Sequence, residues 1–201
     1  MRTNPLIAPA LAGTALLLLC LPAQASDHTK TALIDMEDAR SGGFGGPLVK
    51  LGTINGDNAV LIGGEGGATF TSGAHSLIIG GAGYGLVNEL EWDDTGRKLE
   101  MGYAGLLMGY THQPDRVVHW ESKVLLGAGN VSIVDSGGSN DEDANFLVSE
   151  FSLSGEVNVT DFLEIGIGGA YRLTSEPLID NLDAGDISGP SVFISFQFGQ
   201  I

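Results

Sequence analysis

Serine, histidine and carboxylate side chains can form a hydrolase site only where a nucleophile, a base and an acid meet on one face. The nearest candidates along this chain are His119, Glu121 and Ser122. Side chains alternate between faces in an extended strand, so Ser122 is expected to point away from the other two. His112 and Asp115 lie in a turn-like stretch, where solvated polar residues are usual. We therefore predict no catalytic site.

Carboxylates are grouped in three places, and hard cations such as Ca²⁺ take oxygen ligands. The groups are Asp93-Asp94, Asp141-Glu142-Asp143, and Asp180 with Asp183 and Asp186. None has the spacing of an EF-hand loop, so we predict solvated loop tips, with weak bridging of divalent ions to anionic lipid headgroups as the alternative. Glycine is abundant, but no complete GxGxxG and no glycine followed by lysine occurs. No metal or cofactor site is predicted.

Composition excludes a nucleic-acid partner. The formal net charge is −16, with 25 Asp and Glu against 9 Lys and Arg. Phosphate binding needs clustered basic residues. The single cysteine, Cys20, lies in the first 25 residues, so the rest of the chain has neither a disulfide nor a catalytic thiolate.

The first 25 residues have the features of a signal peptide. Arg2 precedes an apolar stretch from Ala15 to Leu21, and Ala23-Gln24-Ala25 is a small-x-small cleavage pattern. We expect cleavage before Ser26. A lipoprotein anchored at Cys20 is the alternative, but the preceding Leu19 is bulkier than lipoprotein processing favours. Residues 26–41 are predicted to be a polar lead-in and residues 42–201 a single β-barrel domain.

From Gly42 onward, runs rich in Gly, Val, Ile, Leu and aromatic residues alternate with polar breaks, which predicts strands. The eight runs lie near 44–53, 58–70, 75–88, 98–111, 117–134, 146–159, 163–174 and 190–199. Bacterial outer-membrane barrels have an even number of strands. The predicted fold is therefore all-β, an eight-stranded antiparallel up-and-down β-barrel of the transmembrane type.

The last run shows the alternation most clearly. Val192, Ile194, Phe196 and Phe198 share one face, while Ser191, Ser195 and Gln197 share the other. In a membrane barrel the apolar face meets lipid, and in a soluble barrel it points inward. Alternation alone leaves both arrangements open.

The breaks favour the membrane barrel, in which turns are short at the periplasmic end and longer outside. The breaks at 71–74, 112–116 and 160–162 are short, whereas 89–97, 135–145 and 175–189 are long and acidic. The first break, 54–57, is short although it falls on the outer side. A membrane helix over 66–88 is disfavoured, because this stretch holds seven glycines and a turn-like segment.

The same alternation predicts which charges face the lumen. They are Lys50, Glu65, Glu121, Lys123, Glu150, Glu156 and Arg172. Eight strands leave room inside only for side chains, so an internal ion-pair network is favoured over a conducting or ligand-binding lumen. The aromatic residues Phe70, Trp120 and Phe198 fall near the short-turn end, where either an interfacial girdle or ordinary strand packing explains them.

Three glycine-rich segments carry a family resemblance. They are Gly42-Gly43-Phe44-Gly45-Gly46-Pro47, Gly63-Gly64-Glu65-Gly66-Gly67 and Gly80-Gly81-Ala82-Gly83-Tyr84-Gly85-Leu86. The chain resembles a family of glycine-rich exported proteins of Gram-negative bacteria, which are described as small outer-membrane barrels. The resemblance implies this architecture and no particular activity. One departure is the end of the chain, Gln200-Ile201, where many outer-membrane barrels end in an aromatic residue.

These observations lead to three functional hypotheses. The first is a non-enzymatic barrel in the cell outer membrane, in contact with lipid, with a structural, surface-interaction or minor transport role. In it, the acidic loops would contact a surface partner. The second is a soluble periplasmic or secreted barrel that binds a small apolar ligand, and the third is an outer-membrane barrel hydrolase.

Overall fold

The computed structural model describes residues 39–91, 97–134, 140–177, 179 and 182–200. The predicted signal peptide and most of the lead-in lie outside these residues. Nearly all of the described chain is β-strand. The strands are β1 (Arg40–Ile54), β2 (Asp57–Ser72), β3 (His75–Leu86), β4 (Leu90–Glu91), β5 (Lys98–His112), β6 (Val118–Val134), β7 (Asn140–Thr160), β8 (Leu163–Thr174) and β9 (Gly189–Gln200). One short helix, α1 (Ala184–Ile187), precedes β9.

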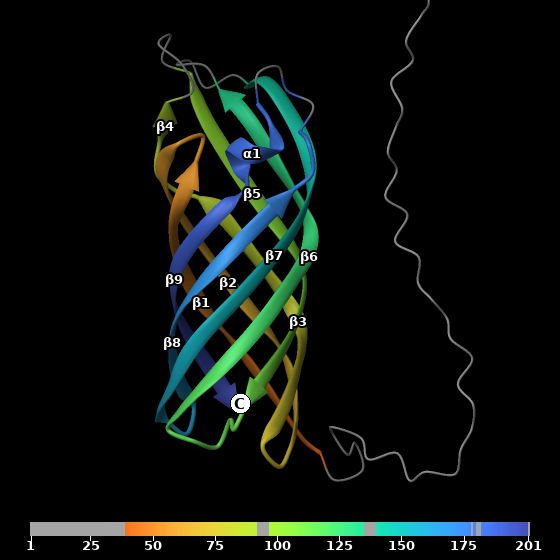
Figure 1. Ribbon diagram of the computed structural model, residues 1–201, viewed down its shortest axis with the longest axis vertical. Coiled ribbons are helices and arrows are strands. Elements are labelled where there is room, and N and C mark those ends of the chain that lie inside the picture. Colours follow the sequence, from red (N-terminus) through yellow and green to blue (C-terminus); the bar gives the residue numbers. More distant parts are fainter. Residues whose placement is uncertain (1–38, 92–96, 135–139, 178, 180–181, 201) are drawn as a thin grey trace, which may run out of the picture. The chain divides into compact units, whose positions relative to one another are not determined.

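Eight long strands close into a barrel (Figure 1). The strands follow the order β3-β2-β1-β9-β8-β7-β6-β5, and β3 pairs with β5 to complete the circle. Every pairing is antiparallel. The prediction of an eight-stranded antiparallel up-and-down barrel is confirmed, with the two-residue β4 added at the edge of β5.

Turn residues set the connections at the two ends of the barrel. The β1–β2 turn consists of Asn55 and Gly56, whose φ angles of 51° and 82° suit the two-residue hairpin turns favoured by strand twist. Gly73 provides the positive φ of the β2–β3 turn. The C-terminal ends of β3, β6 and β8 lie at the same end of the barrel as the β1–β2 turn (Figure 1). We call this the long-loop end and the opposite one the short-turn end.

Both ends of the barrel chain lie at the short-turn end, because Gly43 pairs with Gln200. The stretch 66–88, for which the sequence disfavoured a membrane helix, contains the end of β2 and all of β3. Among the described residues, no helix is long and apolar enough to cross a bilayer.

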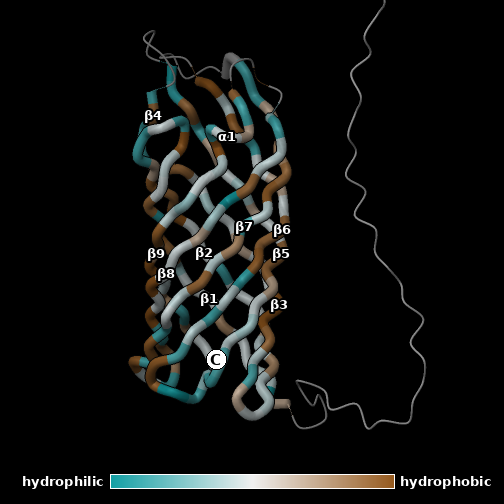
Figure 2. Tube along the Cα trace, viewed as in Figure 1, coloured by the Kyte–Doolittle hydropathy of each residue, from teal (hydrophilic) through white to brown (hydrophobic). Residues whose placement is uncertain are grey.

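The outer face of the barrel is apolar, since the exposed side chains of the strands are mostly hydrophobic. Figure 2 shows hydrophobic and hydrophilic residues interspersed along the strands. On β7 the exposed side chains include Leu147, Phe151, Leu153, Val157 and Val159. These residues span about 40 Å along a strand, or about 30 Å along the axis of a barrel whose strands tilt by about 40°, close to the thickness of an outer-membrane apolar band. The apolar face therefore has the dimensions required to meet lipid.

The soluble-barrel alternative requires the opposite arrangement. Val192 and Phe198 of β9 are 60% and 45% exposed, whereas Ser195 and Gln197 are buried inside. A barrel that carries its polar face inside and its apolar face outside does not offer an apolar ligand pocket. The described residues thus have the pattern of a membrane barrel.

Glycines leave room for large aromatic side chains inside the narrow barrel. Tyr84 lies against Gly63 of the neighbouring strand, where an added Cβ would come within 2.5 Å of the ring. Phe146 lies in the same way against Gly129, whose added Cβ would approach the ring to 2.4 Å. In both pairs the missing side chain makes the space that the aromatic ring fills.

Candidate functional site in the barrel interior

All seven charges assigned to the lumen from the sequence are buried inside the barrel. The exposed fraction is 7% for Glu65 and 4% or less for the other six, which are Lys50, Glu121, Lys123, Glu150, Glu156 and Arg172. They come from β1, β2, β6, β7 and β8, where period-two alternation points them inward. The structure divides these seven side chains between two regions, and only one of the regions is fully paired.

The first region, which we call the central network, consists of Lys50, Glu65, Glu121, Lys123, Glu150 and Arg172 with two tyrosines. Lys50 forms an ion pair with Glu150. Lys123 pairs with Glu65 and, at 2.6 Å, with Glu121. Two lysines therefore pair with all three carboxylates, which offsets the desolvation of these buried charges, and Arg172 brings a third cation to the same region, 5.4 Å from the centroid of the Tyr103 ring.

Tyr84 and Tyr103 complete the central network. The Tyr103 hydroxyl donates to Glu150 Oε2 at 2.7 Å. The ammonium group of Lys50 lies 3.4 Å from the centroid of the Tyr84 ring, which is a close cation–π contact. Arg172 Nε donates to the carbonyl oxygen of Ile187 in α1 at 2.7 Å, so the network also holds the helix. Each charged group thus has partners that restrict its position.

The central network leaves almost no free space. The cavity lined by Lys50, Glu65, Tyr84, Lys123 and Glu150 has a volume of about 10 Å³. A single water molecule needs roughly that much space, about 10–15 Å³. The middle of the barrel is therefore closed to solutes.

An apolar core fills the interior toward the long-loop end, and we call it the apolar seal. Its buried members include Ile54, Val131, Ile133, Phe146, Leu182 and Ile187. The segment before β9 folds inward, because the Asn55 amide donates to the Asp186 carbonyl at 2.7 Å and Thr174 Oγ1 donates to the Ala184 carbonyl at 3.1 Å. These contacts hold Ile187 in the core. The long-loop end is sealed by hydrophobic packing.

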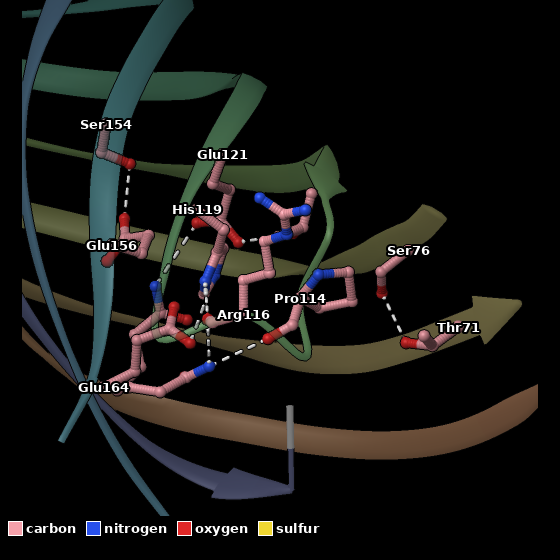
Figure 3. A network of polar contacts seen from close by, with 12 residues as sticks. Thr71, Ser76, Pro114, Arg116, His119, Glu121, Ser154, Glu156 and Glu164 are labelled. Atoms are coloured by element: carbon pink, nitrogen blue, oxygen red, sulfur yellow. Dashed lines mark hydrogen bonds and ion pairs between the residues drawn. The ribbon is translucent and has the colours of Figure 1, made fainter. Parts of the chain in front are cut away.

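The second polar region lies at the short-turn end, and Figure 3 shows part of it. This short-turn cluster consists of His119, Glu156, Glu164, Ser195 and Gln197, all buried. His119 Nε2 lies 3.5 Å from Glu164 Oε2. Ser154 donates to Glu156 Oε1, and Gln197 Nε2 donates to Glu121 Oε1 at 3.3 Å. These contacts connect the cluster to the central network above it.

Several atoms of the short-turn cluster have no hydrogen-bond partner among the described residues. They are His119 Nε2, Glu156 Oε2, both carboxylate oxygens of Glu164, Ser195 Oγ and Gln197 Oε1. A buried polar atom without a partner costs about 1–3 kcal/mol, and more when it is charged. The two polar regions therefore differ in how well their groups are satisfied.

Sequence reasoning missed three polar residues of the interior. Glu164 has the same parity in β8 as Arg172, so alternation alone places it inside. Tyr84 and Tyr103 were not expected there, because aromatic residues in membrane barrels are usually assigned to the lipid face. The apolar seal was also missed, since a polar lumen was assumed throughout.

The residues considered for catalysis do not form a hydrolase site. His119 and Glu121 point inward while Ser122 is on the opposite face, as alternation predicts. Ser195 also lies inside, but neither its hydroxyl nor His119 Nε2 has a hydrogen-bond partner in the described part of the chain. His119 and the two serines, Ser122 and Ser195, therefore lack the contact between nucleophile and base that is the minimum requirement for this chemistry.

Aromatic residues cluster outside the barrel near the short-turn end. Trp120 is 42% exposed and its ring lies 5.5 Å from that of Tyr110. His75 contacts the Tyr110 hydroxyl through Nδ1 at 2.6 Å. Phe198 is also exposed, and Phe70 is half-buried. An exposed aromatic cluster at this end is the arrangement of an interfacial girdle.

The acidic clusters fall partly outside the described residues. Asp93, Asp94 and Asp180 lie there, and the side chain of Asp141 is not described. Asp183 is the N-cap of α1 and Asp186 lies within the helix, where its carboxylate accepts from the Asp183 amide at 2.9 Å. Among the described residues, no group of three or more His, Cys, Asp or Glu side chains is arranged to hold a metal ion.

Solved structures of small outer-membrane β-barrels of Gram-negative bacteria share this fold. Neisserial surface protein A matches with a TM-score of 0.55 and 10% identity, over 81% of this chain and 99% of that chain. Ail, the attachment invasion locus protein of Yersinia pestis, matches with a TM-score of 0.53 and 12% identity, over 79% and 97%. Ail in complex with the heparin analogue sucrose octasulfate matches with a TM-score of 0.50, 11% identity and coverages of 80% and 98%.

At this level of identity the likeness concerns the fold alone. No family model matches the sequence, and no curated protein matches it either. The chain is thus an eight-stranded barrel of the outer-membrane type, and its own residues must carry any argument about its role.

Proposed function

We propose that this protein is a non-conducting, non-enzymatic barrel of the outer membrane that presents acidic loops to a surface partner. The observation that carries this proposal is the closed interior. The central cavity of about 10 Å³ excludes solutes, and the apolar seal covers it at the long-loop end. A barrel without a pore or a catalytic constellation acts through its surface.

Loop length gives the orientation. In outer-membrane barrels the longer loops face the outside of the cell and the short turns face the periplasm. The predicted signal peptide over residues 1–25 supplies the route of export. With both ends of the barrel chain at the short-turn end, the termini would remain in the periplasm.

Charge defines the partner that these loops suit. The three long breaks at 89–97, 135–145 and 175–189 contain twelve carboxylates and one basic residue, Arg97. Of the described carboxylates at this end, Glu89, Glu91, Glu100 and Glu176 are exposed. Such a surface attracts cationic segments and repels polyanions. We therefore expect a cationic protein partner, and not a ligand like the heparin analogue bound by Ail.

Membrane insertion is the first part of the proposal to test. The expressed chain should enter the outer-membrane fraction and should migrate differently on a detergent gel with and without boiling. A protein released without detergent would contradict the proposal and would require the exposed apolar face to be covered in another way.

Conductance tests the closed interior directly. In planar bilayers the purified protein should give no channels above the background of empty detergent. Lys50→Ala and Arg172→Ala, which remove side chains from the lumen, serve as positive comparisons. A steady conductance from the unaltered chain would overturn the non-conducting role.

Binding to the loops is tested with charged probes. A lysine-rich peptide should bind vesicles that contain the protein, and the affinity should fall with salt because exposed charges are screened. Heparin should not bind. A variant with Glu89, Glu91, Glu100 and Glu176 replaced by Gln should lose peptide binding and keep its heat-modifiable mobility. Retained peptide binding in this variant would exclude these four carboxylates as the contact.

A further inference from the structure

The negative charge inside the barrel is unevenly distributed. Among the described residues, nine buried side chains are ionisable as acid, base or imidazole: Lys50, Glu65, His119, Glu121, Lys123, Glu150, Glu156, Glu164 and Arg172. The central network balances three cations with three carboxylates. Of the nine groups, only His119 remains to balance the negative charge of the other two carboxylates, Glu156 and Glu164. A protonated His119 would still leave one negative charge uncompensated.

The short-turn cluster is composed almost entirely of acceptors. His119 Nδ1 lies 3.1 Å from the Arg116 carbonyl oxygen, so the ring donates from Nδ1 and its neutral form presents a lone pair at Nε2. The Gln197 amide donates upward to Glu121, which leaves its Oε1 without a partner. Carboxylates supply only acceptors when ionised. Acceptors that face one another are satisfied either by a proton on one of them or by a cation between them.

Two unpartnered groups that are not acidic lie on the inward face of β9 beside these carboxylates, because Ser195 pairs with Gly166 and Gln197 pairs with Glu164. Ser195 and Gln197 are 0% and 1% exposed, and neither Ser195 Oγ nor Gln197 Oε1 has a hydrogen-bond partner in the described part of the chain. Gly166 lies between Glu156 and Ser195 in the register of β7, β8 and β9. A Cβ added to it would lie 2.0 Å from Glu156 Oε2 and 2.4 Å from Ser195 Oγ. Both oxygens therefore point into the space above this glycine.

The cluster is connected to solvent at the short-turn end. Glu164 lines a hollow of about 470 Å³ between the β5–β6 turn and the β7–β8 turn, together with Asp115 and Asp161. Arg40 also lines the hollow, and its guanidinium is engaged by Asp115 at 2.7 Å. A cation would thus approach from the periplasmic side along a mouth that carries further carboxylates.

We propose that the short-turn cluster is a binding site for a small monovalent cation, an alkali ion or a primary ammonium group, held by Glu156, Glu164, Ser195 and Gln197. Hard cations take carboxylate, hydroxyl and amide oxygens of this kind. A divalent or transition metal is disfavoured, because the described His and carboxylate side chains do not converge in a group of three. The site is independent of the loop surface in the proposed function.

The test measures the unfolding temperature of the refolded protein in detergent at constant ionic strength. Tetramethylammonium chloride is the balancing salt, since its methyl groups prevent hydrogen bonding and close approach. Potassium, 1,4-diaminobutane and magnesium are titrated in separate arms. A ligand that binds only the folded state stabilises it in proportion to the logarithm of its concentration above Kd. We expect a rise in unfolding temperature, with a defined midpoint concentration, in the potassium or the diamine arm.

Variants assign the effect to the cluster. Glu164→Gln and Glu156→Gln should each lower the affinity at least tenfold, whereas Asp57→Asn, which removes an exposed carboxylate at the long-loop end, should leave it unchanged. A response equal in all variants would overturn the site. Dependence on magnesium alone would overturn the monovalent assignment, and the absence of any response in the unaltered protein would show that protons neutralise the carboxylates.

A second measurement tests the site in the unaltered protein, in case the substituted variants do not refold. The ¹⁵N signal of His119 Nε2, assigned with His119→Gln, should shift along a saturable curve with the same cation and with the same midpoint. A constant Nε2 signal across the titration would contradict the proposed site in the unaltered protein.

Discussion

The central network and the short-turn cluster are neighbours inside one barrel and use the same residue types, but they differ in pairing. In the central network, Lys123 contacts two carboxylates from β2 and β6. In the short-turn cluster, Glu164 has no hydrogen-bond donor among the described residues. The difference shows that burial of a carboxylate inside this barrel does not by itself define its role. A paired carboxylate stabilises the fold, whereas an unpaired one is free to bind.

The largest expected effect comes from breaking the central network. Lys123→Met leaves Glu65 and Glu121 buried without their cation, and removing one partner of a buried ion pair costs about 3–5 kcal/mol. Urea titration of the protein in lipid vesicles would measure the free energy of unfolding. A triple variant that also carries Glu65→Gln and Glu121→Gln should recover most of the loss. A loss below about 1 kcal/mol in the single variant would mean that the pairing is unimportant.

A matched pair of substitutions compares the two regions directly. Glu65→Gln removes the charge that Lys123 contacts and should cost about 1.5–3 kcal/mol, as for hydrogen bonds to charged groups. Glu164→Gln removes a buried charge that lies 3.5 Å from His119 Nε2 and has no hydrogen-bond donor among the described residues, and it should be neutral or stabilising in buffer balanced with tetramethylammonium. Equal losses in the two variants, from the same urea titration, would remove the distinction between the regions.

The smallest effects are expected from two serines of the lower interior. Ser154→Ala removes the hydroxyl that donates to Glu156 and should cost about 1 kcal/mol. Ser195→Ala removes a hydroxyl without a partner among the described residues and should change the free energy of unfolding by less than about 0.5 kcal/mol. In saturating potassium or diamine, Ser195→Ala should become the less stable of the two variants, because it binds the cation more weakly than Ser154→Ala does. Calorimetric titration would detect the weaker binding. An unchanged ranking with and without the cation would remove Ser195 from the proposed site.

A comparison of the fold with the sequence shows which signals are strong. The seventh run was expected at 163–174, and β8 spans Leu163–Thr174. The sixth was expected at 146–159, but β7 begins at Asn140, because its partner β6 continues to Val134 and supplies hydrogen bonds to polar residues. Alternation of apolar and polar residues reveals a strand only where its two faces differ in polarity. It does not reveal the part of a strand that extends beyond the apolar band, because both faces are polar there.

The site was less accessible to sequence reasoning. The odd or even position of a residue along its strand is enough to predict that Lys50 or Arg172 points inward. It does not predict which cation contacts which carboxylate. Lys123 and Glu65 are 58 residues apart, on strands separated by two others around the barrel. Their contact depends on the stagger between strands, which sets the height of each residue along the axis.

The sequence by itself determined the number of long strands, their approximate bounds, and the division into an apolar and a polar face. These properties follow from local alternation and from turn residues such as Asn55 and Gly56. Only the tertiary structure decided that Ile187 enters the apolar seal, that Lys123 lies between Glu65 and Glu121, and that Glu164 has His119 beside it but no hydrogen-bond donor among the described residues. Each of these depends on distances across the lumen, and those distances exist only after the barrel has closed.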